Sequence, residues 1–330
     1  MAIGGGKGRR TDRLVVLGGN AGMREPGQVW LVGAGPGDPE LLTLKALKAL
    51  QAAQVVVHDG LVSDEILDLA PVGARRISVA KRKSRHSYSQ DEINRMLVAF
   101  ALEGLNVVRL KGGDPFIFGR GGEELEACRE AGVECHIVPG ITAALAASAS
   151  AGAPLTHRGS AQAVTFVTGH AAQKGRGGGG EPDLDWDSLA RANQTVVIYM
   201  GLSMAAPIAA RLLGAGRAGS TPALIVENAS RADERRVVTT LAGLAEAAAT
   251  LTGPALLIVG EAMALAQALP FPRSGRGEPS AEEPMVERAS LKLSGTTGLP
   301  MTQQAGLALS TPRSAAGGPP LPLRGKGKDQ

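Results

Sequence analysis

Short apolar runs rich in β-branched residues recur along the middle of the chain, and each of them predicts a strand. Several are continuous, which is typical of strands that are buried on both faces. They occupy residues 29–32, 55–58, 106–110, 133–138, 164–168, 195–200, 223–227 and 256–259. Helical patterns lie among these runs. Alternating strands and helices indicate an α/β fold whose sheets are mostly parallel and covered by helices.

Two of the helical patterns can be given bounds. Residues 40–53 and 90–103 each place apolar side chains at intervals that bring them near one helix face. Ser89 and Glu92 form a capping-box pattern at the start of the second segment. We therefore expect a helix to begin directly after Ser89.

The two ends of the chain differ in composition from the middle. From Phe271 onward, Gly and Pro supply 17 of 60 residues, and the first 27 residues look similar. Such segments bury too little apolar surface to offset the entropy of ordering them, so we expect residues 1–27 and 271–330 to be disordered tails. The run KGRGGGG at residues 174–180 predicts a flexible surface loop.

The positive charge of the chain lies in these ends. The net charge of the 330 residues is +4, of which residues 1–27 contribute +3 and residues 271–330 another +3, so the part between them carries −2. Net charge therefore says little about what the folded part binds, and we expect no nucleic-acid partner. A nucleic-acid-binding module remains the alternative that is not an enzyme.

No apolar run is long enough to cross a membrane. The longest candidate, residues 141–155, is too short and is rich in Ala, Ser and Gly. The basic residues near the N-terminus are not followed by the apolar stretch of a secretory signal. We therefore expect a cytoplasmic protein with no membrane partner.

Cysteine and histidine positions give no metal-binding pattern. Cys128 and Cys135, expected on a helix and the following strand, have the spacing of neither a zinc knuckle nor a CxxC redox pair. We interpret them as reduced structural thiols. No two histidines stand at ligand spacing, so no metal is expected; the histidines are His58, His86, His136, His157 and His170.

Three loops that follow predicted strands are the candidates for chemistry. The first, VGAGPGDP at residues 32–39, lets the backbone turn sharply and approach a ligand. Its spacing is G-x-G-x-G instead of the dinucleotide fingerprint G-x-G-x-x-G, and Pro36 removes an N–H that a pyrophosphate would use. A structural turn and a ligand-approaching turn both remain open, and a dinucleotide-dependent oxidoreductase remains a distant alternative.

The second loop, RLKGGDPFIFGRGGEE, ends a strand and opens onto a helix, where open α/β sheets gather their binding sites. Gly112 and Gly113 leave no side chain between backbone and ligand, and Asp114 is an acceptor for a ribose or an amino group. Lys111 and Arg120 are candidates to bind carboxylates. The loop lacks P-loop spacing, which argues against a nucleoside triphosphate, and a purely structural turn is the alternative.

The third loop is VPGITAA, where a strand ends and a small-residue helix begins. Thr142 is placed to cap that helix through its hydroxyl. The same hydroxyl can donate to or accept from a ligand, and the two roles are compatible.

These loops, taken with their flanks, resemble the uroporphyrinogen-III C-methyltransferase family of the tetrapyrrole methylases, which are class III methyltransferases. The matching segments are VGAGPGDPELLTLKALKAL, VVVHDGLVSDEIL, VVRLKGGDPFIFGRGGEE, VPGITAALAASASAGAPLTHR, VTGH and Tyr199-Met200-Gly201. The resemblance covers roughly residues 28–270. The chain is also similar to the C-terminal half of sirohaem synthase, without that protein's dehydrogenase and ferrochelatase portion, so we expect only the methylation step.

The resemblance implies two α/β domains, residues 28–139 and 140–270, with the cofactor folded into the cleft between them, and a homodimer. It implies that S-adenosylmethionine donates methyl groups to C2 and C7 of uroporphyrinogen III, giving precorrin-2 and S-adenosylhomocysteine for sirohaem or cobalamin synthesis. A later precorrin methyltransferase of cobalamin synthesis is the nearest alternative, because it would use the same cofactor loops.

By the same resemblance, much of the cofactor contact comes from backbone groups, which accounts for loops of Gly, Pro and Ala. Ala229 stands where related sequences often have Gly, a change that a backbone contact can survive. The residues that match the family's cofactor contacts are Pro36, Gly112, Gly113, Asp114, Ile117, Thr142, Ala143, Met200 and Ala229.

The resemblance also implies Asp59 as the general base and Lys81 as the proton donor. Asp59 follows the predicted strand 55–58, and capping of the next turn is its structural alternative. Lys81 begins the run Lys81-Arg82-Lys83, whose other interpretations are a solvated basic patch and a partner for substrate carboxylates. Further candidates for those carboxylates are Arg82, Lys83, Lys111, Arg120 and Arg158.

Overall fold

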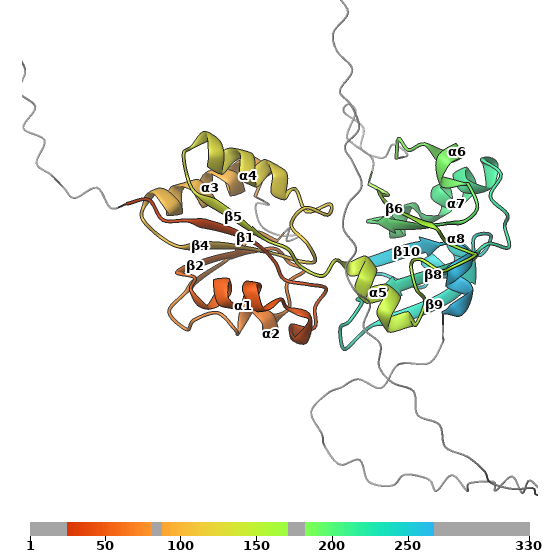
Figure 1. Ribbon diagram of the computed structural model, residues 1–330, viewed down its shortest axis with the longest axis horizontal. Helices are drawn as coiled ribbons and strands as arrows, with labels where there is room; N and C mark the ends of the chain where they lie inside the picture. Colours follow the sequence, from red (N-terminus) through yellow and green to blue (C-terminus); the bar gives the residue numbers. More distant parts are fainter. Residues whose placement is uncertain (1–24, 81–87, 171–181, 267–330) are drawn as a thin grey trace, which may run out of the picture. The chain divides into compact units, whose positions relative to one another are not determined.

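The computed structural model describes residues 25–80, 88–170 and 182–266. All of them belong to one compact unit, Met1–Ser274. The described residues form two five-stranded sheets, one from each half of the sequence (Figure 1). We call residues 25–139 the N-terminal half and residues 140–266 the C-terminal half.

The sheet of the N-terminal half is parallel throughout, as the sequence predicted. Its strand order is β3-β2-β4-β1-β5. The strands are β1 (Val29–Gly33), β2 (Val55–His58), β3 (Arg75–Ser78), β4 (Val107–Lys111) and β5 (Cys135–Val138). In a parallel sheet all carboxyl ends lie at one edge, and the three candidate loops follow β1, β4 and β5 there.

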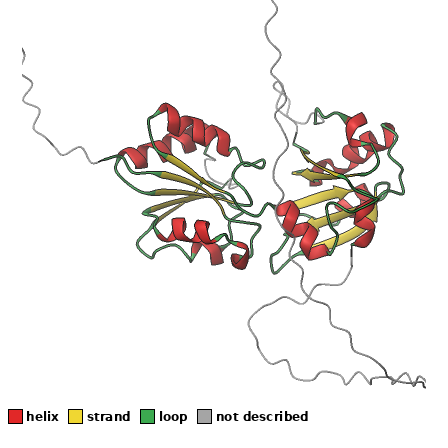
Figure 2. Ribbon diagram, viewed as in Figure 1, coloured by secondary structure: helices red, strands yellow, loops and turns green. Residues whose placement is uncertain are grey.

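Helices cover both faces of this sheet (Figures 1 and 2). Alternate strand residues point to opposite faces, so Val32 and Val56 pack with α1 and α2, whereas Leu31 and Val57 pack with α3 and α4. These helices are α1 (Leu44–Gln51), α2 (Asp64–Leu67), α3 (Gln90–Leu102) and α4 (Gly121–Glu130). Burial on both faces explains why the strands are continuous apolar runs.

Local capping decides where two of these helices begin. The predicted helix over 40–53 is divided: a 3₁₀ turn, η1 (Pro39–Leu41), comes first, and α1 starts after Thr43, whose hydroxyl accepts from the Ala46 N–H at 3.1 Å. The capping box of α3 is confirmed, since Ser89 N–H donates to Glu92 at 2.7 Å and Glu92 N–H donates to the Ser89 hydroxyl at 3.3 Å.

The sheet of the C-terminal half corrects one prediction. Its order is β6-β7-β10-β8-β9, and only the β6–β7 pair is parallel. The strands are β6 (Ala163–Thr168), β7 (Gln194–Tyr199), β8 (Pro222–Glu227), β9 (Arg235–Thr240) and β10 (Ala255–Val259). A mostly parallel sheet was therefore wrong here, because β8 and β9 join through a short reversal and β10 inserts antiparallel between β7 and β8.

The helices of the C-terminal half also lie on two faces. The core under α6, α7 and α8 includes Ile198 and Leu257, and the core under α5 includes Val197 and Ile258. The bounds are α5 (Ala143–Ala151), α6 (Trp186–Leu189), α7 (Ala205–Gly214), α8 (Leu244–Ala248), η2 (Leu202–Met204) and η3 (Glu261–Leu265). The alanines of α5 let this helix approach its sheet closely.

The two-sheet α/β architecture agrees with the expected fold, while the boundary between residues 139 and 140 stays a prediction. The predicted loop at 174–180 and nearly all of both predicted tails lie outside the described residues. Within the described ranges no helix is long and apolar enough to cross a membrane.

Candidate active site

A cavity of about 470 Å³ is lined by residues from both halves. The N-terminal half contributes the loops at the carboxyl ends of β1, β2 and β4, and the C-terminal half contributes the start of α5 and residues after β7 and β8. All nine residues that match the cofactor contacts of the resembling family line this cavity: Pro36, Gly112, Gly113, Asp114, Ile117, Thr142, Ala143, Met200 and Ala229. The fold thus gathers positions up to 193 residues apart in sequence around one space.

The glycine-rich loops interlock through their backbones. Gly35 and Gly113 exchange hydrogen bonds, at 3.2 Å from the Gly35 N–H and at 2.6 Å from the Gly113 N–H. A Cβ at Gly140 would lie 2.2 Å from the Gly113 carbonyl oxygen, and one at Gly33 would lie 2.5 Å from the Gly140 nitrogen. Glycine is required at these contacts because no side chain fits between the loops.

Asp114 joins the second loop to the third. Its Oδ1 accepts from the Phe116 N–H at 2.8 Å, and its Oδ2 accepts from the Gly140 N–H at 3.0 Å. The carboxylate therefore holds the loops together. Because each oxygen has a second lone pair, this structural role leaves the predicted contact with a ribose or amino group open.

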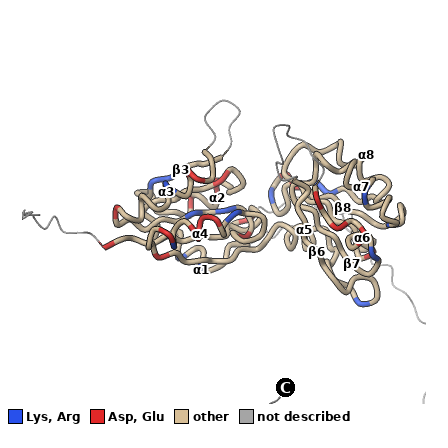
Figure 3. The backbone as a smooth tube through the Cα atoms, turned by 90° about the horizontal axis from the view of Figure 1, so that it is seen from above, with Lys and Arg blue, Asp and Glu red and all other residues tan. Residues whose placement is uncertain are grey.

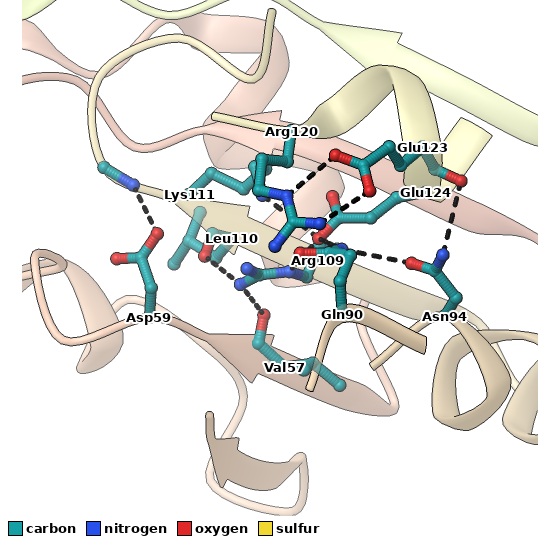
Figure 4. A network of polar contacts seen from close by, with 11 residues as sticks. Val57, Asp59, Gln90, Asn94, Arg109, Leu110, Lys111, Arg120, Glu123 and Glu124 are labelled. Atoms are coloured by element: carbon teal, nitrogen blue, oxygen red, sulfur yellow. Dashed lines mark hydrogen bonds and ion pairs between the residues drawn. The ribbon is translucent and has the colours of Figure 1, made fainter. Parts of the chain in front are cut away.

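Asp59 follows β2 and lines the same cavity (Figure 4). Its Oδ1 accepts from the Leu61 N–H at 3.0 Å, which is the turn-capping role, and its Oδ2 accepts from the Gly112 N–H at 3.2 Å. Half-buried between two loops, the carboxylate has a fixed orientation and faces the cavity wall formed by Gly112. The structural and the chemical interpretations of Asp59 are therefore compatible.

Figure 3 shows acidic and basic positions next to one another along the backbone near α4. Some of these side chains form a buried cluster of charges beside the second loop (Figure 4). One oxygen of Glu124, Oε1, accepts from Arg109 Nε at 2.9 Å, from Lys111 Nζ at 3.1 Å and from Gln90 Nε2 at 3.2 Å. Arg109, Lys111 and Glu124 are 4%, 3% and 0% exposed. Arg109, Lys111 and Gln90 line the cavity, so Glu124 fixes three polar side chains of its wall from behind.

This cluster changes the interpretation of Lys111. Burial lowers the pKa of its ammonium below the ordinary lysine value, and the charge of Arg109 lowers it further, while Glu124 opposes both. Although Lys111 lines the cavity, its side chain is almost fully buried and its ammonium is paired with Glu124, which makes it a less accessible partner for a substrate carboxylate. The second oxygen of Glu124 has no hydrogen-bond partner among the described residues.

The other candidates for substrate carboxylates lie in different surroundings. Arg120 lines the cavity and holds Glu123 through two hydrogen bonds of 2.7 Å, with its side chain 57% exposed. Arg158 is exposed and does not line the cavity. Lys81, Arg82 and Lys83 lie outside the described residues.

Tyr199 is a site residue to which the sequence reasoning gave no role. Its hydroxyl lies 2.7 Å from the Thr142 hydroxyl and accepts from the Ala144 N–H at 3.3 Å. Burial raises the pKa of Tyr199, although these hydrogen bonds oppose the shift. Thr142 occupies the N-cap position of α5 but makes its hydrogen bond to Tyr199 instead of capping the helix with its side chain. The available signal was the position of Tyr199 at the end of a predicted strand beside Met200.

Left-handed backbone gathers at the cavity. Phe118, Arg120, Met200 and Asn228 have φ values of 52°, 59°, 54° and 53°, and all four line it. Such conformations cost free energy for residues other than glycine, and they cluster where a site needs a particular backbone direction.

The cysteines lie where the sequence placed them. Cys128 is buried on α4, and Cys135 is half-buried on β5. Both are free thiols. The described residues contain no group of three or more His, Cys, Asp or Glu able to hold a metal ion.

Known proteins similar to this chain include tetrapyrrole methylases and siroheme synthases. The family model for tetrapyrrole (corrin/porphyrin) methylases matches residues 28–245. Siroheme synthase 1 of Yersinia enterocolitica is 52% identical over 242 residues, which make up 73% of this chain and 50% of that protein. Siroheme synthase 2 of Aeromonas hydrophila is 50% identical over 265 residues, 80% of this chain and 55% of that protein. The chain spans about half the length of these curated relatives.

Two solved structures give the comparison in three dimensions. Uroporphyrin-III C-methyl transferase from Thermus thermophilus, complexed with S-adenyl homocysteine, matches with a TM-score of 0.62 and 44% identity, covering 72% of this chain and 100% of that one. A cobalt precorrin-4 methyltransferase matches with a TM-score of 0.63 and 30% identity, covering 72% of this chain and 95% of that one.

Proposed function

Because the chain belongs to the tetrapyrrole (corrin/porphyrin) methylases, and is therefore a methyltransferase, we propose that it methylates uroporphyrinogen III at C2 and C7. S-adenosylmethionine is the proposed donor, and precorrin-2 and S-adenosylhomocysteine are the products. The proposal places the enzyme in sirohaem or cobalamin synthesis. Family membership argues against the dinucleotide-dependent oxidoreductase and the nucleic-acid-binding module.

One observation carries this proposal: the nine candidate cofactor residues and Asp59 all line one cavity. Its volume of about 470 Å³ lies within the range of roughly 300–1,000 Å³ that is typical of small-molecule sites. Because the glycines carry no side chains, the backbone of these loops can approach the adenosine and amino-acid parts of the donor closely. The 44%-identical structural relative that was solved with S-adenyl homocysteine supports the same cofactor.

The chemistry needs positioning more than covalent help. When bound, S-adenosylmethionine supplies a sulfonium methyl group that is already activated toward an electron-rich pyrrole carbon. The interlocked loops fix the geometry of the cavity wall, and holding two reactants in line supplies a large part of the barrier reduction. The Gly35–Gly113 and Asp114–Gly140 hydrogen bonds make this wall rigid.

Asp59 is the proposed base for the proton that the substrate loses after methylation. Two backbone N–H groups orient its carboxylate, one on each oxygen, and each oxygen keeps a lone pair for a proton. Lys81 stays the predicted proton donor. Arg120 is the described candidate best placed to bind a substrate carboxylate, because it lines the cavity with an exposed guanidinium.

A later precorrin methyltransferase remains the second candidate, because the cobalt precorrin-4 methyltransferase shares the fold at 30% identity. The higher identity of 44% to the uroporphyrin-III enzyme favours the first methylation. The homodimer stays a prediction that light scattering of the purified protein tests.

The test is an anaerobic incubation of the protein with S-adenosylmethionine and either uroporphyrinogen III or purified precorrin-2, followed by product mass. We expect a gain of two methyl groups on uroporphyrinogen III and none on precorrin-2. Methylation of precorrin-2 alone would support the second candidate. No gain on either substrate, with S-adenosylhomocysteine still raising the melting temperature, would overturn both.

A further inference from the structure

The segment that joins β8 to β9, residues 228–234, is held in one conformation by its own contacts. Asn228 and Ser230 have left-handed backbone, with φ of 53° and 65°. The Ser230 N–H donates to Glu234 Oε2 at 2.6 Å, and Asn228 Nδ2 donates to Asp233 Oδ2 at 2.8 Å. These side-chain hydrogen bonds stabilise the strained backbone of the segment. Arg231, its middle residue, is therefore held in a defined position.

Ser230 and Arg231, in the middle of this segment, contact two loops of the N-terminal half. The Asp38 N–H donates to the Ser230 hydroxyl at 3.2 Å. The stem of Arg231 packs on Gly37, where a Cβ would lie 2.7 Å from Arg231 Cγ. At its far end, the Arg231 guanidinium donates through Nη2 to the carbonyl oxygen of Leu61.

Leu61 supplies one of the two backbone N–H groups that orient the proposed base. Its N–H donates to Asp59 Oδ1 at 3.0 Å, while its carbonyl accepts from Arg231. Its side chain is close to the second loop, because a Cβ at Gly112 would lie 2.7 Å from Leu61 Cβ. Leu61 is therefore held from three directions: by Arg231, by Asp59 and by the loop whose Gly112 N–H binds the other oxygen of Asp59.

We propose that Arg231 is a positioning residue: a guanidinium of the C-terminal half fixes Leu61, and through Leu61 the orientation of the Asp59 carboxylate. The inference rests on the proposed function, in which Asp59 is the base. It couples the two halves, since the β8–β9 segment must contact the N-terminal loops for the base to be aligned. The planar, donor-rich guanidinium suits this task better than an ammonium, because it keeps one direction while its stem packs on Gly37.

The expected effect is on turnover more than on cofactor affinity. A misplacement of about 1 Å of a catalytic group can reduce the rate on the order of 100-fold. Arg231→Gln should therefore lower kcat with uroporphyrinogen III on the order of 10- to 100-fold, with little change in the Kd of S-adenosylhomocysteine. Arg231→Lys should recover part of the loss. The matched control is Arg235→Gln, since Arg235 contacts only Glu227 and Thr250 of its own half in the contacts described.

The deciding experiment is a double-mutant cycle of kcat with Asp59→Asn and Arg231→Gln, with melting temperatures and S-adenosylhomocysteine titrations for every variant. If Arg231 acts through Asp59, the Arg231→Gln substitution does not lower kcat further once Asp59 is replaced. Asp59→Asn and the double variant then have the same kcat. The inference would be overturned if the fold-loss of kcat in the double variant equalled the product of the two single losses. A wild-type kcat in Arg231→Gln would overturn it as well. Should Arg231→Gln fail to fold, Arg231→Lys enters the same cycle and is judged by the same rule.

The cycle also separates this inference from the proposed function. If Asp59→Asn abolishes most turnover while Arg231→Gln does not lower it, the base assignment stands and the positioning role is wrong. If Asp59→Asn keeps full turnover, the base and its positioning residue are both rejected, and methyl transfer itself is unaffected.

Discussion

The two halves of the molecule contribute different groups to the cavity wall. The N-terminal half presents the backbone of glycine loops that pack too closely for any side chain, beside the side chains of Asp59 and Arg120 and with charges buried behind the loops. The C-terminal half presents side chains, with the Tyr199 hydroxyl, the left-handed Met200 and the guanidinium of Arg231. The closely packed glycines allow almost no substitution. The side chains of the C-terminal half can instead be changed by removal of a single functional group.

This contrast predicts how variants rank. Changes to the glycine loops should act on stability and on cofactor binding together, because the same close backbone contacts hold the loops and form the cavity wall. Changes to the C-terminal wall should separate the two, because its side chains lie on a sheet that folds around its own core. Single substitutions in the two walls, with matched controls, distinguish these outcomes.

Glu124→Gln should give the largest loss of stability. Removal of this buried charge leaves Arg109 and Lys111 without a counter-ion, which typically costs about 3–5 kcal/mol. Urea unfolding measures the free energy change. The matched control is Glu123→Gln, the adjacent residue, whose ion pair with Arg120 is half exposed and should cost less than about 1 kcal/mol. Equal effects of the two variants would show that the buried cluster does not stabilise the N-terminal half.

Gly140→Ala should come next and should affect binding as well as stability, because Gly140, the first residue of the C-terminal half, packs directly against the glycine loops of the N-terminal half. Its Cβ would lie 2.2 Å from the Gly113 carbonyl oxygen, so the second and third loops must separate. We expect a loss of about 1–3 kcal/mol in unfolding free energy and a large loss of S-adenosylhomocysteine affinity by calorimetry. Gly122→Ala is the control, because a Cβ there meets nothing within 4 Å on α4. That variant should keep or raise stability, and unchanged affinity in Gly140→Ala would contradict the backbone-built wall.

Tyr199→Phe should have a smaller effect, confined to the C-terminal wall. It removes the hydroxyl that joins Thr142 to the Ala144 N–H at the start of α5. We expect a loss of about 1 kcal/mol in stability and roughly fivefold weaker S-adenosylhomocysteine binding. Thr142→Val should cause a similar loss, and the double variant should show less than the sum of the two. Additive losses would mean that the two hydroxyls act independently.

Arg120→Gln should change neither stability nor cofactor affinity much. Because its guanidinium lies exposed at the cavity, we expect the KM for uroporphyrinogen III to rise roughly tenfold, as expected for one charge-assisted hydrogen bond. Arg158→Gln should leave KM unchanged, since Arg158 does not line the cavity. Steady-state kinetics of both variants decide this assignment, and the reverse order would place the substrate carboxylates at Arg158.

Local patterns predicted much of the fold. Buried strands such as β2 and the capped start of α3 depend on side chains within a few residues, and the sequence shows these directly. Strands β3 and β9 were missed because their RRIS and RRVVTT sequences are largely polar and half exposed. Strand direction in the C-terminal sheet was wrong, because it depends on which strands pair across long separations.

The site residues likewise include some that the sequence pointed to and others that only the structure shows. The glycine loops were found from the sequence because Gly-rich turns follow predicted strands, whereas the resemblance to a known family pointed to Asp59 and assigned the roles. The sequence did not predict roles for Glu124, Tyr199 and Arg231. Each of them contacts a residue from a separate segment of the chain, and a local pattern does not show such a contact. The Arg231–Leu61 contact spans 170 positions, and no local pattern reports it.

The central claim is that this cavity transfers methyl groups with Asp59 as the base. The most direct measurement is an anaerobic incubation of uroporphyrinogen III with S-adenosylmethionine that carries a trideuterated methyl group, followed by product mass for the wild-type protein and for Asp59→Asn. We expect two labelled methyl groups on the wild-type product and strongly reduced transfer by Asp59→Asn. An unlabelled product, or equal labelling by the two proteins, would contradict it.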